Sequence, residues 1–352
     1  MLATRAQQIY GDDPCTGFMP HVLEKNRFDP IPEELAAKMH KMIAIIQFKV
    51  EGQTIMNHPE FKLDHRLMLD KINLDEGTVN CYGEVYPIKD TNLPTIDPAD
   101  PYKLSPEEEE VMVALEASIT NSKKLQEHIN FLYTHGALFT TYNGNLLFHG
   151  CIPFTEDGDF MEVTIAGKTN HGAGLMRQLD QELREVYFNP RCDLDKADAA
   201  NLMWYLWLGP DSPLFGKDKM TTFERLFIAD KSTHKEHTVP YYKLIKNKDI
   251  CIKIIRDFDL DPSKGIILNG HVPVKIKDGE SPIKGEGKLI VIDGGISKAY
   301  QKTTGIAGYT FIFNSWFMAL SEHEPYHPLQ PDGTQEFNNP NIVTTHTLPA
   351  RM

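Results

Sequence analysis

Two histidines lie directly after apolar segments and next to a glycine, His149 in LLFHG and His271 in ILNGH. Neutral imidazole is a common ligand of divalent metals, and glycine lets the backbone turn sharply and approach an ion closely. The histidines are far apart in the chain, so they meet only if the fold brings them together. The pattern alone leaves two interpretations open: a shared metal ion, or two imidazoles that each hydrogen-bond a turn.

Four lysines follow the second of these histidines within a short stretch of an acidic chain: Lys275, Lys277, Lys284 and Lys288. Ammonium groups close to a metal hold phosphate oxygens as point charges. The alternative interpretation is a solvated loop without a ligand. These lysines are therefore candidates for binding the phosphate of a substrate, on charge and position alone.

The composition indicates a globular protein of ordinary type. The chain has 352 residues, 41% of them hydrophobic, with 36 Lys and Arg against 49 Asp and Glu and a net charge of −13. The length allows about two domains. The acidity argues against nucleic acid as a partner, and no apolar run reaches the roughly 18 residues that a membrane span needs. The N-terminus has no apolar run, so we expect neither a signal peptide nor a typical transit peptide.

The cysteines indicate a reducing compartment. The chain has 5 of them, scattered and without a CxxC pair: Cys15, Cys81, Cys151, Cys192 and Cys251. This usage favours free thiols and predicts a cytoplasmic protein.

Hydrophobic periodicity places the elements that would position the histidines. An apolar stripe predicts a helix over 34–50, and Ser105-Pro106-Glu107-Glu108 is typical of a helix start. That second helix is expected to run through Ile119 and on toward Leu132. Asn143-Gly144 between two apolar runs predicts a hairpin whose second strand ends at His149.

The patterns in the second half of the chain predict helices followed by strands. Helical stripes predict a helical insertion or side layer over about 170–260. Apolar strands are expected at 265–268, 288–292 and 309–313, and their continuous apolar character indicates a sheet covered on both faces. The expected class is α/β, with a mainly helical region with proline-rich loops at 1–135 and the sheet-bearing part at 136–352.

Several long strings resemble the class III fructose-1,6-bisphosphatases of low-GC Gram-positive bacteria, which belong to the calcineurin-like metallophosphoesterases. The strings are YGDDPCTGFMP, HPEFKLDHRLMLDKI, LLFHGCIPF and the run from ILNGHVPVKIKDGESPIKGEGK to FIFNS. The resemblance implies a sandwich of two mixed sheets flanked by helices. It also implies hydrolysis of the 1-phosphate of fructose 1,6-bisphosphate, a sugar bisphosphate, to fructose 6-phosphate in gluconeogenesis.

The resemblance implies a dinuclear manganese (Mn2+) site, in which His149 and His271 are ligands of one metal. Three other family motifs are absent: Gly11-Asp12-Asp13-Pro14 lacks the histidine of Asp-x-His, and neither GDxxDR nor GNH occurs. In the family these motifs lie N-terminal to the part present here. The chain is thus similar to the C-terminal portion of such an enzyme, and we assign no general acid to it.

Two hypotheses follow about what the chain does. The first is a metallophosphatase represented by its C-terminal part, as a split-gene product, a truncated gene model or a fragment. The second is a non-catalytic companion that folds onto an N-terminal chain or binds sugar phosphates as a regulator. Both predict a partner, either the N-terminal half or a homologous chain, because half a sandwich exposes apolar sheet edges.

Overall fold

The computed structural model describes residues 1–20, 31–165, 167–189, 196–295, 304, 308–323 and 341–347. The chain forms two compact units, of which the first comprises residues 1–136, 194–209 and 217–237. The second comprises residues 137–193, 210–216 and 238–352. Two stretches inside the predicted helical insertion therefore group with the N-terminal residues. Helices and mixed sheets both occur, so the class is α/β as predicted.

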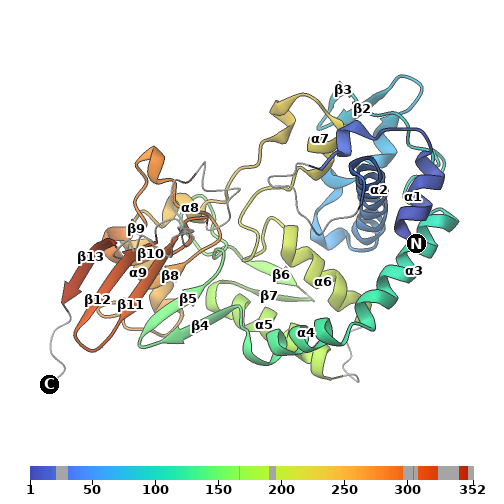
Figure 1. Ribbon diagram of the computed structural model, residues 1–352. Coiled ribbons are helices and arrows are strands. Elements are labelled where there is room, and N and C mark those ends of the chain that lie inside the picture. The colour runs from blue at the N-terminus through green and yellow to red at the C-terminus, as the bar shows by residue number, and fades with distance from the viewer. Residues whose placement is uncertain are drawn as a thin grey trace, which may run out of the picture. The chain divides into compact units, whose positions relative to one another are not determined.

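The first unit is mainly helical and carries one small antiparallel sheet, ordered β1-β2-β3 (Figure 1). Its α-helices are α1 (Leu2–Tyr10), α2 (Glu33–Asn57), α3 (Pro106–Thr120), α4 (Lys123–His135), α6 (Lys196–Leu208) and α7 (Thr222–Phe227). Its strands are β1 (Ile72–Asn73), β2 (Thr78–Cys81) and β3 (Glu84–Pro87). Short 3-10 turns are η1 (Thr16–Phe18), η2 (Pro59–Phe61), η3 (Asp64–Arg66), η4 (Leu69–Lys71) and η5 (Lys231–His234).

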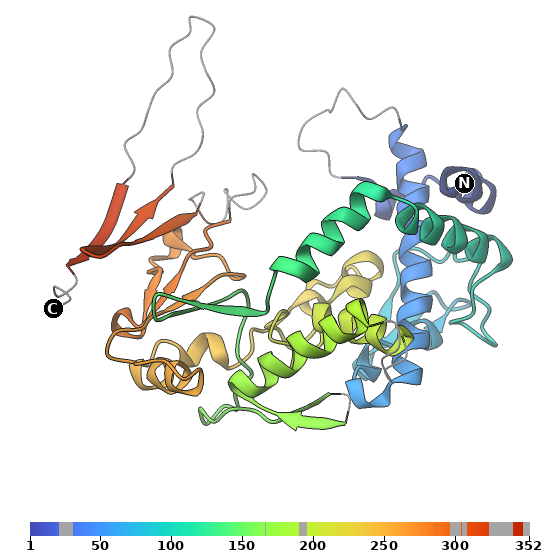
Figure 2. The ribbon, with the colours of Figure 1, turned by 90° about the horizontal axis from the view of Figure 1, so that it is seen from below.

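Helix α2 extends beyond the predicted 34–50 and packs against α1 (Figure 2). It buries two lysines that a one-face pattern would leave in water. The Nζ atom of Lys41 lies 2.9 Å from Asp13 and 2.6 Å from Asp90, and that of Lys49 lies 2.7 Å from Glu108. These ion pairs from distant parts of the chain let α2 be buried on more than one face, because a buried charge is tolerated when it is paired.

The predicted helix after Ser105 begins as expected but is interrupted. Ser105 and Glu108 form a reciprocal capping box at the start of α3. Helix α3 ends at Thr120, and the Ser122 side chain then accepts the Leu125 N–H as the cap of α4. The expectation of one continuous helix toward Leu132 is therefore wrong, because a second capping residue starts a new helix.

The second unit contains the main sheet. Its strands are β4 (Phe139–Tyr142), β5 (Asn145–Phe148), β6 (Val163–Ile165), β7 (Lys168–Asn170), β8 (Ile267–Asn269), β9 (Ile283–Lys284), β10 (Leu289–Val291), β11 (Tyr309–Phe313), β12 (Phe317–Glu322) and β13 (Asn341–Thr347). Its helices are α5 (Gly172–Phe188), α8 (Tyr241–Leu244) and α9 (Lys248–Asp257), with 3-10 turns η6 (Ile276–Asp278) and η7 (Gly285–Gly287).

Five strands form a mixed sheet in the order β4-β5-β8-β10-β9. Strands β5, β8 and β10 are parallel neighbours, whereas β4 and β9 are antiparallel edges. The predicted hairpin between β4 and β5 is confirmed, with Asn143 at φ 52° and Gly144 at φ 78°. Positive φ at both central residues matches the twist of a two-residue hairpin.

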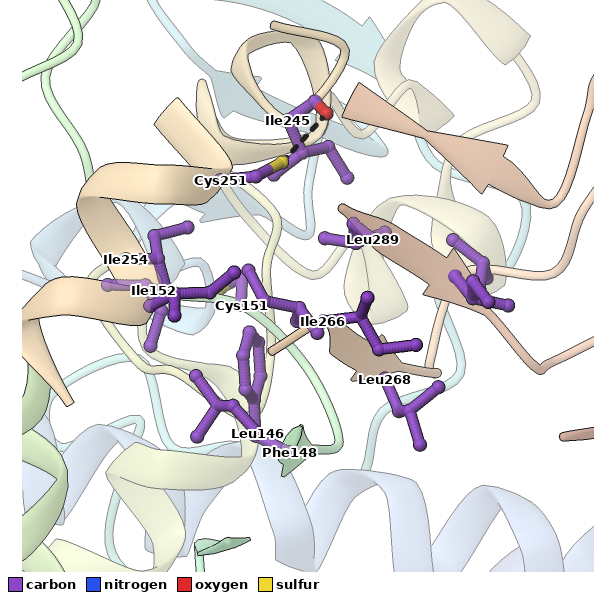
Figure 3. Close-up of a cluster of buried hydrophobic side chains, with 14 of the residues drawn as sticks. Leu146, Phe148, Cys151, Ile152, Ile245, Cys251, Ile254, Ile266, Leu268 and Leu289 are labelled. Carbon is purple, nitrogen blue, oxygen red and sulfur yellow. Dashed lines mark hydrogen bonds between the residues drawn. The ribbon is translucent and has the colours of Figure 1, made fainter. Parts of the chain in front are cut away.

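Both faces of this sheet are covered, as its apolar strands predict. Figure 3 shows Ile254 of α9 and Ile152 beside Leu146 of β5 and Leu289 of β10. On the other face, β11 and β12 bring Phe311, Met318 and Leu320 against the side chains of Ile266, Ile283 and Ile290. The sheet β11-β12-β13 therefore forms a second layer on the main sheet.

The cysteines and the apolar content of the helices were also the subject of predictions. Cys15, Cys81, Cys151 and Cys251 are buried free thiols, and Cys192 lies outside the described residues. Burial raises the pKa of Cys251 to about 12, which keeps its thiol protonated. Among the described residues, no helix has the length and apolar character needed to cross a membrane.

The Asp13 carboxylate should make the first unit sensitive to acid. Burial alone would raise its pKa, but hydrogen bonds from Lys41, the Cys15 N–H and Asn92 outweigh burial and lower it to about 2. The unfolded value is higher, so this stability is present above about pH 4 and disappears as pH falls toward 2. We expect Asp13→Asn to lower the free energy of unfolding by about 2 kcal/mol at pH 6, measured by urea unfolding.

The neighbouring Asp12 is exposed and supplies the control. Asp12→Asn should change stability by less than about 0.5 kcal/mol. A destabilisation by Asp13→Asn that stays constant from pH 6 to pH 2 would contradict this role for the carboxylate.

Candidate functional site

The sheet brings the two predicted histidines to one edge. Strand β5 ends at Phe148, directly before His149, and β8 ends at Asn269, two residues before His271. Strands β5 and β8 are parallel neighbours, paired through Leu146 with Ile267. Their carboxyl ends therefore meet, at the place where open α/β sheets usually bind ligands.

The two imidazole rings face each other. His149 Nε2 lies 3.0 Å from His271 Nδ1, and the ring planes are 75° apart. His149 is exposed and His271 is half-buried, so the pair opens to solvent. The structure thus brings together residues separated by 122 positions in the chain.

The Phe215 carbonyl sets the tautomers of the pair. It lies 2.8 Å from His271 Nε2 and can only accept a hydrogen bond, so that nitrogen carries the proton. In neutral His271, Nδ1 then has a free lone pair, and His149 donates to it through Nε2–H. His271 has φ 67°, a left-handed conformation that non-glycine residues adopt infrequently.

Backbone groups connect the two loops below the rings. The Gly270 N–H donates to the His149 carbonyl at 3.0 Å. The buried Asn269 side chain donates through Nδ2 to the carbonyls of His149 at 3.1 Å and Gly150 at 2.6 Å. Sequence reasoning treated Asn269 only as part of a turn, although a buried polar residue just before the Gly-His pair was a usable signal.

A segment around Pro213 packs beneath the same loop. The Cys151 N–H donates to the Pro213 carbonyl at 2.8 Å, and a Cβ on Gly150 would lie 2.2 Å from that oxygen. Gly150 is therefore required by the approach of another backbone segment. Sequence reasoning missed Pro213 and Phe215, because no local pattern distinguishes them from ordinary loop residues.

The surroundings keep His149 neutral. Partial removal of water from its ring lowers the pKa of His149, and the neighbouring His271 acts in the same direction. Asp293, which follows β10, opposes both effects. A neutral imidazole is the form that binds a metal ion.

The pair fits two positions of a divalent metal. Neighbouring ligands of an octahedral ion lie about 3.0 Å apart when each bond is about 2.1 Å, which matches the observed separation of 3.0 Å. An ion would be held by His149 Nε2 and His271 Nδ1 in place of their mutual hydrogen bond, with the His149 proton moved to Nδ1 and the Phe215 carbonyl keeping the second ring in place. Within the described residues, no group of 3 or more His, Cys, Asp or Glu side chains is arranged to hold an ion.

The four candidate lysines divide into two pairs. Lys275 and Lys277 are exposed and lie on the histidine side of the sheet, where the Val274 N–H donates to the Asp293 carbonyl at 3.0 Å. The backbones of Lys284 and Lys288 lie at the start of β10. The Lys284 ammonium group pairs with Glu280 at 2.6 Å, and the other carboxylate oxygen of Glu280 accepts the Lys275 N–H at 3.0 Å. Lys288 donates to the Pro262 carbonyl at 2.6 Å. Phosphate binding by the lysines stays a prediction, and the exposure of Lys275 and Lys277 favours these two.

These features define an α/β protein with a histidine pair at the carboxyl ends of two parallel strands. A family model described as Firmicute fructose-1,6-bisphosphatase matches residues 1–346, and the chain belongs to this family. A class 3 fructose-1,6-bisphosphatase of Clostridium tetani is 54% identical over 92% of this chain and 49% of its own length. The enzyme of the same name from Clostridioides difficile is 49% identical over 100% of this chain and 53% of its own.

The chain thus spans about half the length of the curated relatives that it matches. No solved structure gave a significant match. The family assignment agrees with the resemblance seen in the sequence.

The two glycines beside the histidines should respond differently to substitution. Gly150→Ala would push a methyl group into the Pro213 carbonyl, whereas a Cβ on Gly270 would have ordinary contacts at 3.5 Å or more. We expect Gly150→Ala to lower the free energy of unfolding by about 1–3 kcal/mol. Gly270→Ala should cost less than about 1 kcal/mol by the same urea titration. Equal losses would show that the Pro213 contact does not determine the need for glycine at position 150.

Proposed function

We propose that this chain is the part of a fructose-1,6-bisphosphatase that supplies one histidine pair of its metal centre. In this proposal the complete enzyme hydrolyses the 1-phosphate of fructose 1,6-bisphosphate. The observation that carries the proposal is the 3.0 Å approach of His149 Nε2 to His271 Nδ1 in a chain of this family. The substrate is the one named for the relatives, fructose 1,6-bisphosphate.

The residues of this chain would hold the metal ion and attract the substrate. His149 Nε2 and His271 Nδ1 face each other at 3.0 Å, and the Phe215 carbonyl keeps the proton of His271 on the far side of its ring. A divalent ion, which we take to be manganese, polarises phosphoryl oxygens and makes water a stronger nucleophile near neutral pH. Lys275 and Lys277 lie exposed on the same side of the sheet, where ammonium groups would attract a sugar bisphosphate.

The rest of the centre must come from outside this chain. Two imidazoles leave most ligand positions of an octahedral ion to water, and such an ion is weakly held. We propose that a second segment, carrying the Asp-x-His, GDxxDR and GNH motifs, completes the site. The layered sheets of the second unit support a metallophosphoesterase-type sandwich, and an enzyme of central sugar metabolism would work in the cytoplasm.

Reconstitution tests this proposal. The chain would be mixed with the part of the Clostridium tetani relative that it does not cover, and phosphate release from fructose 1,6-bisphosphate would be followed with Mn2+. We expect Mn2+-dependent release that falls at least about 100-fold in His149→Ala and in His271→Ala, because each removes a direct ligand.

His128→Ala serves as the matched control, because His128 is exposed on α4 in the other unit and should leave turnover unchanged. Full turnover by either site variant would contradict the ligand assignment. If no phosphate is released while the two chains still bind each other, the chain is a non-catalytic companion instead.

The lysine pairs provide a second test in the same reconstituted system. Lys275→Ala should raise KM for the bisphosphate several-fold with little loss of stability, because its side chain is exposed. Lys288→Ala should instead lower the melting temperature, because its ammonium group donates to the Pro262 carbonyl. An unchanged KM in Lys275→Ala would remove that lysine from the phosphate site.

A further inference from the structure

Asn269 is a buried polar side chain directly below the histidine pair. Its exposed fraction is 1%, and it lies at the last position of β8. Its Nδ2 donates to the carbonyls of His149 and Gly150 at 3.1 and 2.6 Å, with a longer contact of 3.5 Å to that of Phe148. One amide group thus contacts three consecutive carbonyls at the point where β5 ends.

The His149 carbonyl is fixed from two directions. It accepts both the Asn269 amide and the Gly270 N–H, the latter at 3.0 Å. The ring above it is much less restrained, because within the described residues its recorded hydrogen bond is the one to His271. His271 has an additional anchor in the Phe215 carbonyl at 2.8 Å. The position of the His149 ring therefore depends mainly on how its own backbone is held.

We propose that Asn269 is a positioning residue that holds the end of β5 so that His149 faces His271 at ligand distance. This role rests on the proposed function of the pair for its metal-binding consequence, but the geometric consequence exists without a metal. Within the described residues, the hydrogen bonds of the Asn269 amide group go to backbone carbonyls at the end of β5. It acts through the carbonyls of the His149 turn, as outer-shell groups act on metal ligands elsewhere.

Asn145 provides a matched control in the same pair of strands. It is also a buried asparagine, 3% exposed, and it lies at the first position of β5. Its Oδ1 accepts the N–H of Ile266 at 3.2 Å, just before β8 begins. Each asparagine therefore connects β5 to β8, but Asn145 does so at the end away from the histidines. Loss of either side chain leaves buried backbone groups unpaired, whereas only loss of Asn269 should disturb the ring pair.

The first experiment uses the metal-free chain. Nitrogen NMR of histidine-labelled protein would detect the N–H···N bond between His149 and His271, and amide exchange would report the Gly270 N–H. In Asn269→Ala we expect this bond signal to disappear and Gly270 exchange to accelerate at least tenfold. In Asn145→Ala both signals should match those of the wild type. Asn269→Ser, a milder change, covers the case in which Asn269→Ala does not fold.

The second experiment uses Zn2+ as a probe, because Zn2+ binds imidazole more tightly than Mn2+ and suits a site with few ligands. Calorimetric titrations of each variant would be compared with His149→Ala, which accounts for binding to other histidines. We expect Asn269→Ala to weaken the His149-dependent binding by about 10–100-fold. In Asn145→Ala the His149-dependent Zn2+ affinity should stay within about twofold of the wild-type value.

The outcomes separate the two proposals. Loss of the ring-pair signal and of Zn2+ affinity in the Asn269 variants, with Asn145→Ala unaffected, supports the positioning role. An intact ring-pair signal in both folded Asn269 variants would overturn it and leave the histidines as ligands. If wild type and His149→Ala bind Zn2+ equally, the metal assignment fails, and the ring-pair signal alone then decides the role of Asn269.

Discussion

The parallel pairing of β5 with β8 is the constraint on which the candidate site depends. Its register places Leu146 opposite Ile267 and Leu147 opposite Leu268, so that both strands end at the same edge. A slip of one residue would turn every side chain of a strand to the opposite face. It would also move His149 by about 3.3 Å, more than the tolerance of a metal–ligand bond. Burial of Leu146 and Ile267, each 0% exposed, makes such a slip costly.

The loops beneath the two imidazole rings are held firmly, whereas the rings themselves are open to solvent. The loops beneath the rings are held by Gly270, Asn269 and the Pro213 segment through short contacts to backbone carbonyls. The rings face solvent, and the described residues place no carboxylate close enough to complete a metal site. The chain covers about half the length of its relatives. An incomplete, solvent-open histidine pair is what we would expect if the other half of the enzyme supplied the remaining ligands.

Local signals in the sequence predicted the local structure well. Asn143-Gly144 and the Ser105 capping box need only their neighbours to form, and both occur where predicted. Helix α2 is buried on more than the predicted apolar face because Lys41 is paired with Asp13 and Asp90, a pairing that no helical pattern reveals. The break at Ser122 was missed because a capping serine and an ordinary helical serine look alike in one sequence.

The site itself was only partly predictable. His149 and His271 were found because each follows an apolar strand and neighbours glycine, and the expectation that they share one metal came from the family resemblance. The contact of Phe215 with His271 is a tertiary one, as is that of Pro213 with the loop after His149. Lys288 was grouped with Lys275 by sequence proximity, but it lies at the start of β10, where its ammonium group donates to the Pro262 carbonyl.

Binding of one divalent ion by His149 and His271 can be tested by anomalous X-ray diffraction. The crystals would contain the chain joined to the missing segment and be grown with Mn2+. We expect a manganese peak within about 2.3 Å of both His149 Nε2 and His271 Nδ1. Rings turned away from each other, or manganese bound without either nitrogen, would contradict it.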